Sequence, residues 1–320
     1  MKKILLLTAA LLLGFLARSQ EADNLGTGYA EVSFVARAEF SNDPETNHLG
    51  GSSFYAILDG AFNSNLSYFV QAHLLSCTPT DLYTSTLYSD STNWLDYAYL
   101  NYDFGQLDLT VGKQALCVGK SEMQGDDYDV FWEDASILWL ELPSYQWGAT
   151  LNWTPADESF YLQAQVATSP FGERPFKSGQ FSYSLLYCST FREHFQDMYS
   201  FNMLQMEDGY FLKLFNVGLD FNYGDWNFGF DGTIDFFTFR LPNSKTFYAN
   251  YTLSDKLTLG AKFGLDNMNE DFTWSTNRWY GGLRALWFPV ESLRVHALAG
   301  YDTLMESMTF NLGATWKISL

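Results

Sequence analysis

Hydrophobic and polar residues alternate at every second position along most of this chain. The clearest case is the stretch 95–114, where two alternating runs flank a tight turn. A period of two that is interrupted by a turn predicts an antiparallel β-hairpin. On this pattern we assign one face of the hairpin to Tyr97, Tyr99, Asn101, Leu107, Leu109 and Val111, and the other face to the residues between them.

The same unit recurs to the end of the chain. Strands are expected over residues 29–40, 54–62, 66–75, 95–102, 107–114, 145–153, 160–166, 181–187, 198–206, 215–223, 226–236, 247–253, 257–265, 279–288, 293–301 and 308–320. These make about sixteen strands, joined by short turns on one side and longer loops on the other.

This arrangement predicts an all-β fold, a transmembrane antiparallel β-barrel with short periplasmic turns and longer extracellular loops. Aromatic residues near the strand ends agree with it, because membrane barrels carry aromatic girdles at both interfaces. A soluble secreted sandwich or a lipocalin-like barrel is the alternative. It is disfavoured because a soluble domain would have to bury the many aromatic side chains of the outer strand faces.

The N-terminal residues indicate where the protein is exported. Lys2 and Lys3 precede an apolar run over residues 4–17, and small residues follow. This is the pattern of a secretory signal peptide, expected over residues 1–19 and cleaved near Ser19 and Gln20. Residues 20–320 would then form a barrel in the cell outer membrane. The chain is 47% hydrophobic and 18% aromatic, yet its mean hydropathy is only −0.14, because its apolar residues are spread by alternation.

The formal net charge of −19 makes nucleic acid an unsuitable partner. Solvated extracellular loops explain such acidity, and a pore that attracts cations is the alternative explanation. The three cysteines, Cys77, Cys117 and Cys188, allow one disulfide at most. Their spacing is not that of a zinc site, so we expect neither a metal nor a cofactor.

The stretch AYLNYDFGQLDLTVGKQALCVG over residues 98–119 resembles the phosphate-selective porin O and P family of outer-membrane porins. The resemblance rests on the Ala-Tyr start of one strand and on Val-Gly-Lys-Gln, residues 111–114, in the next. It implies a barrel with a water-filled lumen, often a homotrimer, through which small solutes pass passively. Phosphate selectivity would require rows of Arg and Lys along the pore, and the long segment after Lys113 is acidic instead.

That segment, residues 115–144, is where the alternation lapses, and loops of this length are usually functional or disordered. If it folds into the lumen, it would form a pore constriction from Glu122, Asp126, Asp127, Asp129, Glu133 and Asp134. The alternative is a solvated cap outside the barrel.

Strand parity points further charged residues toward the lumen, where they would form a charged wall. These residues are Arg37, Asp96, Asp220, Asp231, Asp235, Lys262, Arg284 and Arg294. The bases of the C-terminal strands and the acids of an earlier hairpin are segregated, so they would set up a transverse field that sorts ions. In the alternative interpretation the lumen charges merely satisfy one another.

We therefore expect an outer-membrane porin for passive diffusion of small hydrophilic solutes and ions, with a weak preference for cations. The alternatives are a phosphate- or anion-selective porin, as in the resembled family, or a barrel with an adhesin, hydrophobic-channel or lipolytic role. An enzyme is not expected, because the four histidines, His48, His73, His194 and His296, suggest no common placement with a nucleophile and an acid. The expected partners are outer-membrane lipid, the solutes and further copies of the chain.

Overall fold

The computed structural model describes residues 28–42, 52–76, 95–123, 135, 136, 138, 142, 145–172, 179–189, 194–206, 208–235, 243–270, 273–303 and 306–320. No helix in this part of the chain is long and apolar enough to cross a membrane. One short 3₁₀ helix, η1 (Ser121–Met123), accompanies the strands. The strands are β1 (Tyr29–Ser41), β2 (Ser53–Ala61), β3 (Leu66–Ser76), β4 (Leu95–Asp103), β5 (Leu107–Ala115), β6 (Tyr145–Trp153), β7 (Phe160–Thr168), β8 (Phe181–Ser189), β9 (Phe195–Gln205), β10 (Phe211–Tyr223), β11 (Trp226–Asp235), β12 (Asn243–Ser254), β13 (Leu257–Glu270), β14 (Thr273–Val290), β15 (Leu293–Asp302) and β16 (Ser307–Ser319).

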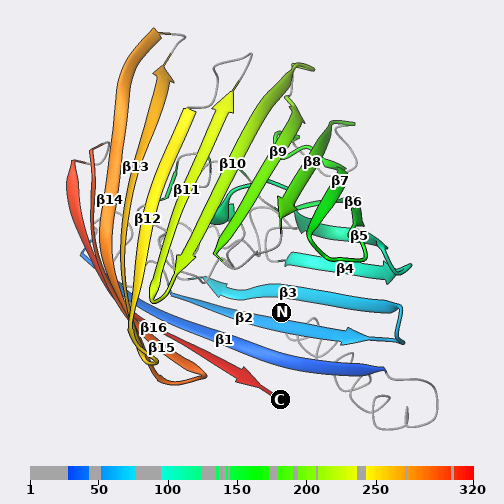
Figure 1. Ribbon diagram of the computed structural model, residues 1–320, viewed down its shortest axis with the longest axis horizontal. Coiled ribbons are helices and arrows are strands. Elements are labelled where there is room, and N and C mark those ends of the chain that lie inside the picture. The colour runs from blue at the N-terminus through cyan, green and yellow to red at the C-terminus, as the bar shows by residue number, and fades with distance from the viewer. Residues whose placement is uncertain are drawn as a thin grey trace.

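The strands form one closed antiparallel barrel. Each strand pairs with its neighbours along the chain, and β1 pairs with β16, for example Ala38 with Ala314. Figure 1 shows the closure, with the red β15 and β16 beside the blue β1. The predicted transmembrane β-barrel of about sixteen strands is thus confirmed, including the two strands between residues 179 and 206, where the sequence pattern is least regular.

The outer face of the barrel is apolar. In β10 and β11, aromatic and aliphatic side chains such as Phe221 and Phe228 are exposed outward, whereas Asn216 and Asp231 are buried inside. Rings pack against one another near the short turns, in the pairs Tyr102–Phe104, Phe195–Phe221 and Trp226–Tyr251. Others do so near the opposite ends of the strands, in the pairs Tyr183–Phe211 and Phe263–Trp279. Two aromatic bands of this kind are the pattern expected at the two membrane interfaces.

One face assignment made from the alternation is wrong. Tyr99 lies opposite Gly112 and Leu100 lies opposite Val111, so the tyrosines of β4 do not share a face with the leucines of β5. The reason is the two-residue turn, closed by a hydrogen bond of 2.8 Å from the Phe104 N–H to the Leu107 carbonyl. A turn of this length pairs odd positions of one strand with even positions of the next. Tyr97, Tyr99 and Asn101 therefore share a face with Asp108 and Thr110.

Strands β13 and β14 are longer than predicted. They reach Glu270 and Thr273, so only two residues separate them. Polar residues hide the alternation in this extension, where the Asn267 side chain donates a hydrogen bond of 2.8 Å to Asn277.

Candidate functional site

Residues 116–123, which we call the insert, leave the end of β5 and lie against the inside of the barrel wall. Apolar side chains on both sides of this contact make one buried cluster. Its members are Leu116, Val118, Leu138, Leu142, Ala167, Leu204, Leu212 and Leu214. Burial of these side chains, at about 1.5–3 kcal/mol for each large one, is a strong reason for the insert to stay on the wall.

Hydrogen bonds between uncharged groups fix the first half of the insert. The Cys117 N–H donates to Gln165 Oε1 at 3.1 Å, and Asn202 Nδ2 donates to the Cys117 carbonyl at 2.8 Å. The Gly119 N–H donates to Ser200 Oγ at 2.8 Å. A Cβ atom at Gly119 would lie only 2.9 Å from the backbone of β9, so the chain can come this close only with glycine. We call these contacts of Leu116, Cys117, Val118 and Gly119 the neutral anchor.

Sequence reasoning missed the wall beneath this anchor. It named charged residues of the lumen and not these leucines: Leu204, Leu212 and Leu214 face inward and are at most 1% exposed. The signal was present in the sequence, because these leucines occupy inward positions next to strands with polar inward residues. Apolar residues at inward positions indicate a segment that covers them.

Charged groups fix the second half of the insert. Glu122 accepts hydrogen bonds from Lys262 Nζ at 2.8 Å and from Lys120 Nζ at 3.1 Å. Ser136 also donates two hydrogen bonds to the Glu122 carboxylate. Its N–H donates to Oε1 at 2.9 Å, and its hydroxyl donates to Oε2 at 2.5 Å. We call this arrangement of Lys120, Glu122, Ser136 and Lys262 the charged anchor. The side chains of the three charged residues are at most 7% exposed.

Two predicted wall residues hold the backbone at the same point. Asp231 accepts hydrogen bonds from the N–H groups of Ser121 at 2.8 Å and Glu122 at 2.9 Å, and Asp220 accepts one from the Ser121 hydroxyl at 2.5 Å. The inward Gly218 leaves room for the insert, since a Cβ there would lie 3.2 Å from the Cα of Lys120. The acids of the wall thus accept hydrogen bonds from backbone N–H groups of the insert, and Lys262 of the wall pairs with the carboxylate of Glu122.

The electrostatics of Glu122 follow from these contacts. Burial alone would raise the pKa of this carboxyl group, but the ammonium groups of Lys262 and Lys120 and the hydrogen bonds to it lower the pKa well below its usual value of 4.5. Glu122 is therefore ionised at neutral pH.

A further ion-pair group, which sequence reasoning missed, lies next to the charged anchor. Arg278 donates to Asp266 at 2.8 Å, to Asp302 at 2.5 and 2.8 Å, and to the Ala135 carbonyl at 2.9 Å. Its parity points inward, but it lies in the polar extension of β14, outside the strand expected over residues 279–288. Through Ala135 it holds the far end of the segment that begins at Glu122.

The other predicted wall residues make separate contacts. Arg37 pairs with Glu39, which also contacts His296, and Asp235 is 2% exposed. Arg284 donates to Asn250 at 2.9 Å and Arg294 to Thr315 at 3.2 Å.

The alternation of inward and outward positions along β4 does not explain why Asp96 is buried. The register of β3 and β4 shifts at Gln71, and Asp96 is the extra residue. Its carboxylate lies 2.8 Å from His73 Nδ1.

The predicted constriction residues are only partly covered by the structure. Glu122 lies in the charged anchor, whereas Asp126, Asp127, Asp129, Glu133 and Asp134 lie outside the described residues. The role of all six in a constriction stays a prediction.

Two of the three cysteines can be placed. Cys117 and Cys188 are buried free thiols, and Cys77 lies outside the described residues. Burial raises the pKa of Cys117 to about 12. Within the described residues, no group of three or more His, Cys, Asp or Glu side chains is arranged to hold a metal ion.

The comparisons with known proteins agree with this architecture. A family model described as phosphate-selective porin O and P matches residues 15–304. Among solved structures, a loop-deletion mutant of OmpT, an outer membrane protein of Vibrio cholerae, is 16% identical, with a TM-score of 0.61 over 92% of this chain and 100% of that one. OmpT in a trimer form is 15% identical, with a TM-score of 0.59 over 92% of this chain and 99% of that one. A mutant of the Rh. blastica porin is 10% identical, with a TM-score of 0.61 over 91% of this chain and 100% of that one. None of the curated protein sequences matches the chain.

Proposed function

The chain belongs to the phosphate-selective porin O and P family and is an outer-membrane porin, and from this premise we propose that it passes small hydrophilic solutes and ions passively with a weak preference for cations. The proposal includes export by a signal peptide, residues 1–19. N-terminal sequencing of the mature protein tests that part, with a first residue at Gln20 expected.

The contact between Glu122 and Ser136 carries the proposal. The chain between these residues holds Asp126, Asp127, Asp129, Glu133 and Asp134. Both of its ends are fixed at one point on the inner wall, by Lys262 of β13 at one end and by Arg278 of β14 through Ala135 at the other. We propose that this loop brings its five acids to the solute path, where such a group raises the local concentration of cations.

The bases of the inner wall support the preference for cations over phosphate. A phosphate path requires Arg and Lys side chains that are free to replace the water around the anion. In the described lumen, four bases have carboxylate partners, namely Arg37, Lys120, Lys262 and Arg278. Arg284 and Arg294 donate instead to the neutral side chains of Asn250 and Thr315. The charge of the four paired bases is largely neutralised locally, so these four offer an anion little attraction.

Single-channel conductance of the refolded protein in a planar bilayer tests the preference. The reversal potential under a salt gradient is expected to show cation selectivity. Replacing Asp126, Asp127 and Asp129 by Asn together should reduce it. The matched control changes Asp157, Asp225 and Asp255 to Asn, which removes the same charge from the short turns at the end of the barrel. Anion selectivity of the unmodified protein, or an equal effect of both triple variants, would contradict the proposal.

A channel rather than an enzyme is part of the same proposal. The two described histidines of the lumen contact carboxylates, His73 at Asp96 and His296 at Glu39. Hydrolytic barrels need a histidine beside a nucleophile as well. Assay of the refolded protein on phospholipid vesicles is expected to release no fatty acid.

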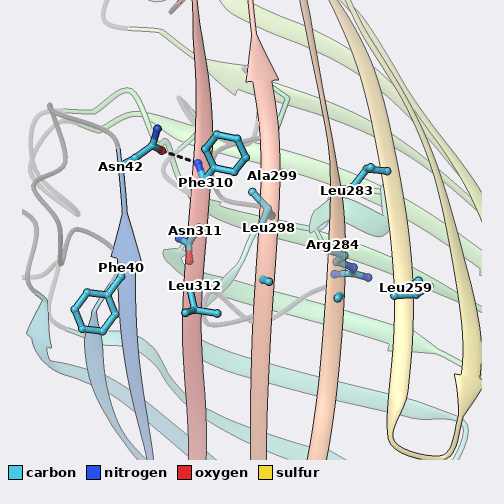
Figure 2. A pocket seen from close by; sticks show the side chains of 12 residues that line it. Phe40, Asn42, Leu259, Leu283, Arg284, Leu298, Ala299, Phe310, Asn311 and Leu312 are labelled. Atoms are coloured by element: carbon cyan, nitrogen blue, oxygen red, sulfur yellow. Dashed lines mark hydrogen bonds between the residues drawn. The ribbon is translucent and has the colours of Figure 1, made fainter.

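We further propose a homotrimer that uses the outer face of β13–β16 and β1. A groove of about 830 Å³ runs across these strands, with Ala285, Ala297 and Ala299 between larger side chains such as Phe40 and Leu283. Figure 2 shows Phe40, Phe310 and Leu312 on one side of the groove and Leu259 and Leu283 on the other. A hollow of this shape admits the side chains of a neighbouring wall.

Filling the groove tests the proposed contact. Ala297→Trp should shift the detergent-solubilised protein from trimer to monomer in native mass spectrometry. Ala164→Trp places the same side chain on the outer face of β7 and should leave the trimer intact. A monomeric unmodified protein would contradict the homotrimer.

A further inference from the structure

A polar cavity of about 490 Å³ lies inside the barrel, between the first residues of the insert and the wall near the short turns. Its volume falls within the range of about 300–1,000 Å³ that is usual for small-molecule sites. The side chains on which the argument rests come from β4, β5 and β6. They are Tyr97, Tyr99, Asn101, Asp108, Gln114 and Asn152.

One side of the cavity is aromatic. Tyr99 stacks on Phe69 with ring centres 5.6 Å apart and an interplanar angle of 26°. Tyr97 meets the same Phe69 ring edge-on at 5.6 Å, and Tyr145 meets Tyr97 at 4.8 Å. These contacts fix the orientation of the tyrosines, and each ring is only partly buried. Because the rings are already ordered, they offer apolar faces to a ligand and lose little conformational entropy when it binds.

The lining also holds two amides, one on β5 and one on β6, each with an unused hydrogen-bonding atom. Gln114 is 7% exposed, and its Nε2 has no protein partner, while its Oε1 accepts from Thr150 at 2.7 Å. The Oδ1 of Asn152 also has no protein partner, while its Nδ2 donates to Asp108 at 3.3 Å. Asp108 fixes the orientation of the Asn152 amide, because a carboxylate can only accept. Thr150 does not fix that of Gln114, because its hydroxyl accepts from Gln165 and can either donate to or accept from Gln114. Both residues line the cavity, and each keeps one buried hydrogen-bonding atom without a protein partner.

From this juxtaposition we infer that the cavity is a binding subsite for a neutral polyhydroxylated solute of monosaccharide size. A hydroxyl group both donates and accepts, so it suits the amide, carboxylate and hydroxyl side chains of Asn101, Asp108 and Thr110 in the lining, and the C–H face of a sugar ring packs on the tyrosines. An ammonium ion only donates, and Asp108 repels an anion such as phosphate. The inference rests on the proposed function, since it names a solute class for the same pore.

Isothermal titration calorimetry of the folded protein in detergent, with glucose as the probe, tests the subsite without requiring conductance. Saturable binding is expected. Tyr99→Leu should weaken it about fivefold, whereas Tyr99→Phe should retain it because the ring is kept. Gln114→Met, which keeps the side-chain length and removes the amide, should also weaken it.

Charge and position provide the controls. Asp108→Asn keeps the hydrogen bonding of the site and should leave glucose binding in place. Asn250→Ala removes an inner-wall amide of β12, outside the cavity, and should have no effect. Absence of glucose binding, or equal binding by Tyr99→Leu, would overturn the inference. So would binding of tetramethylammonium, but not glucose, that disappears in Asp108→Asn, since that result identifies a cation site. Because conductance is measured separately, a conducting protein that does not bind glucose would refute the subsite and leave the porin unaffected.

Discussion

The two halves of the insert reach the same wall by different means. The neutral anchor combines buried leucines, amide hydrogen bonds and a glycine in close contact with β9. The charged anchor places one carboxylate between two lysines and a serine. Packing of the first kind does not depend on the presence of a particular partner charge, whereas a buried carboxylate is favourable only while its partners remain. The comparison therefore predicts that the two anchors fail under different perturbations.

The largest effect is expected from Lys262→Met, which keeps the length of the side chain and removes its charge. Glu122 would stay buried with only one of its lysines. Breaking a buried ion pair costs about 3–5 kcal/mol, and the remaining Lys120 puts this variant at the lower end. Hydrogen exchange followed by mass spectrometry should show faster exchange at Ser121 and Glu122.

The double variant Lys262→Met with Glu122→Gln separates charge from shape. With both charges removed, the amide can still accept from Ser136, so much of the protection should return. No recovery in the double variant would mean that Lys262 acts through packing, and the contrast between the anchors would then be lost.

A smaller effect is expected from Gly119→Val in the neutral anchor. Its Cβ would lie 2.9 Å from backbone atoms of Tyr199 and Ser200, which cannot move without disturbing β9. Overpacking of this kind costs about 1–3 kcal/mol, and exchange should rise at residues 117–119 first. Gly232→Val is the control, because there the nearest atoms belong to the movable ring of Phe230. Equal exchange in the two variants would show that the close approach at Gly119 is not limiting.

The features of this structure that the sequence predicts are those that repeat along the chain. Alternation is a local property, so the strands and the inward positions of Asp220 and Asp231 could be predicted. Pairing across a turn depends on the length of the turn, and the faces of the hairpin over 95–114 were assigned incorrectly for that reason.

The candidate site was harder to predict, because its contacts join positions far apart in the chain. Lys262 and Glu122 are 140 residues apart, and no periodicity links them. Leu212 and Leu214 give the clearest sign that the lumen contains a covering segment, and this sign depends on first knowing that they face inward.

The smallest effect is expected from a change of pH, which is negligible near neutrality. Acid should weaken the charged anchor, and alkali should weaken the neutral anchor. The pKa of Glu122 in the folded protein is lowered below 4.5, so its contribution is complete above the unfolded value and is lost as the pH falls through the folded value. The Cys117 thiol behaves in the opposite way. Its pKa is raised from 9.0 to about 12, so the neutral anchor is fully stable below pH 9.0 and weakens as the pH rises toward 12.

Exchange corrected for its intrinsic rate should therefore increase first at Ser121 and Glu122 in acid, and first at residues 117–119 in alkali. In Glu122→Gln the acid response should disappear while the alkaline response remains. A common response of both anchors at either extreme would show that the insert detaches as one unit, whichever anchor is perturbed.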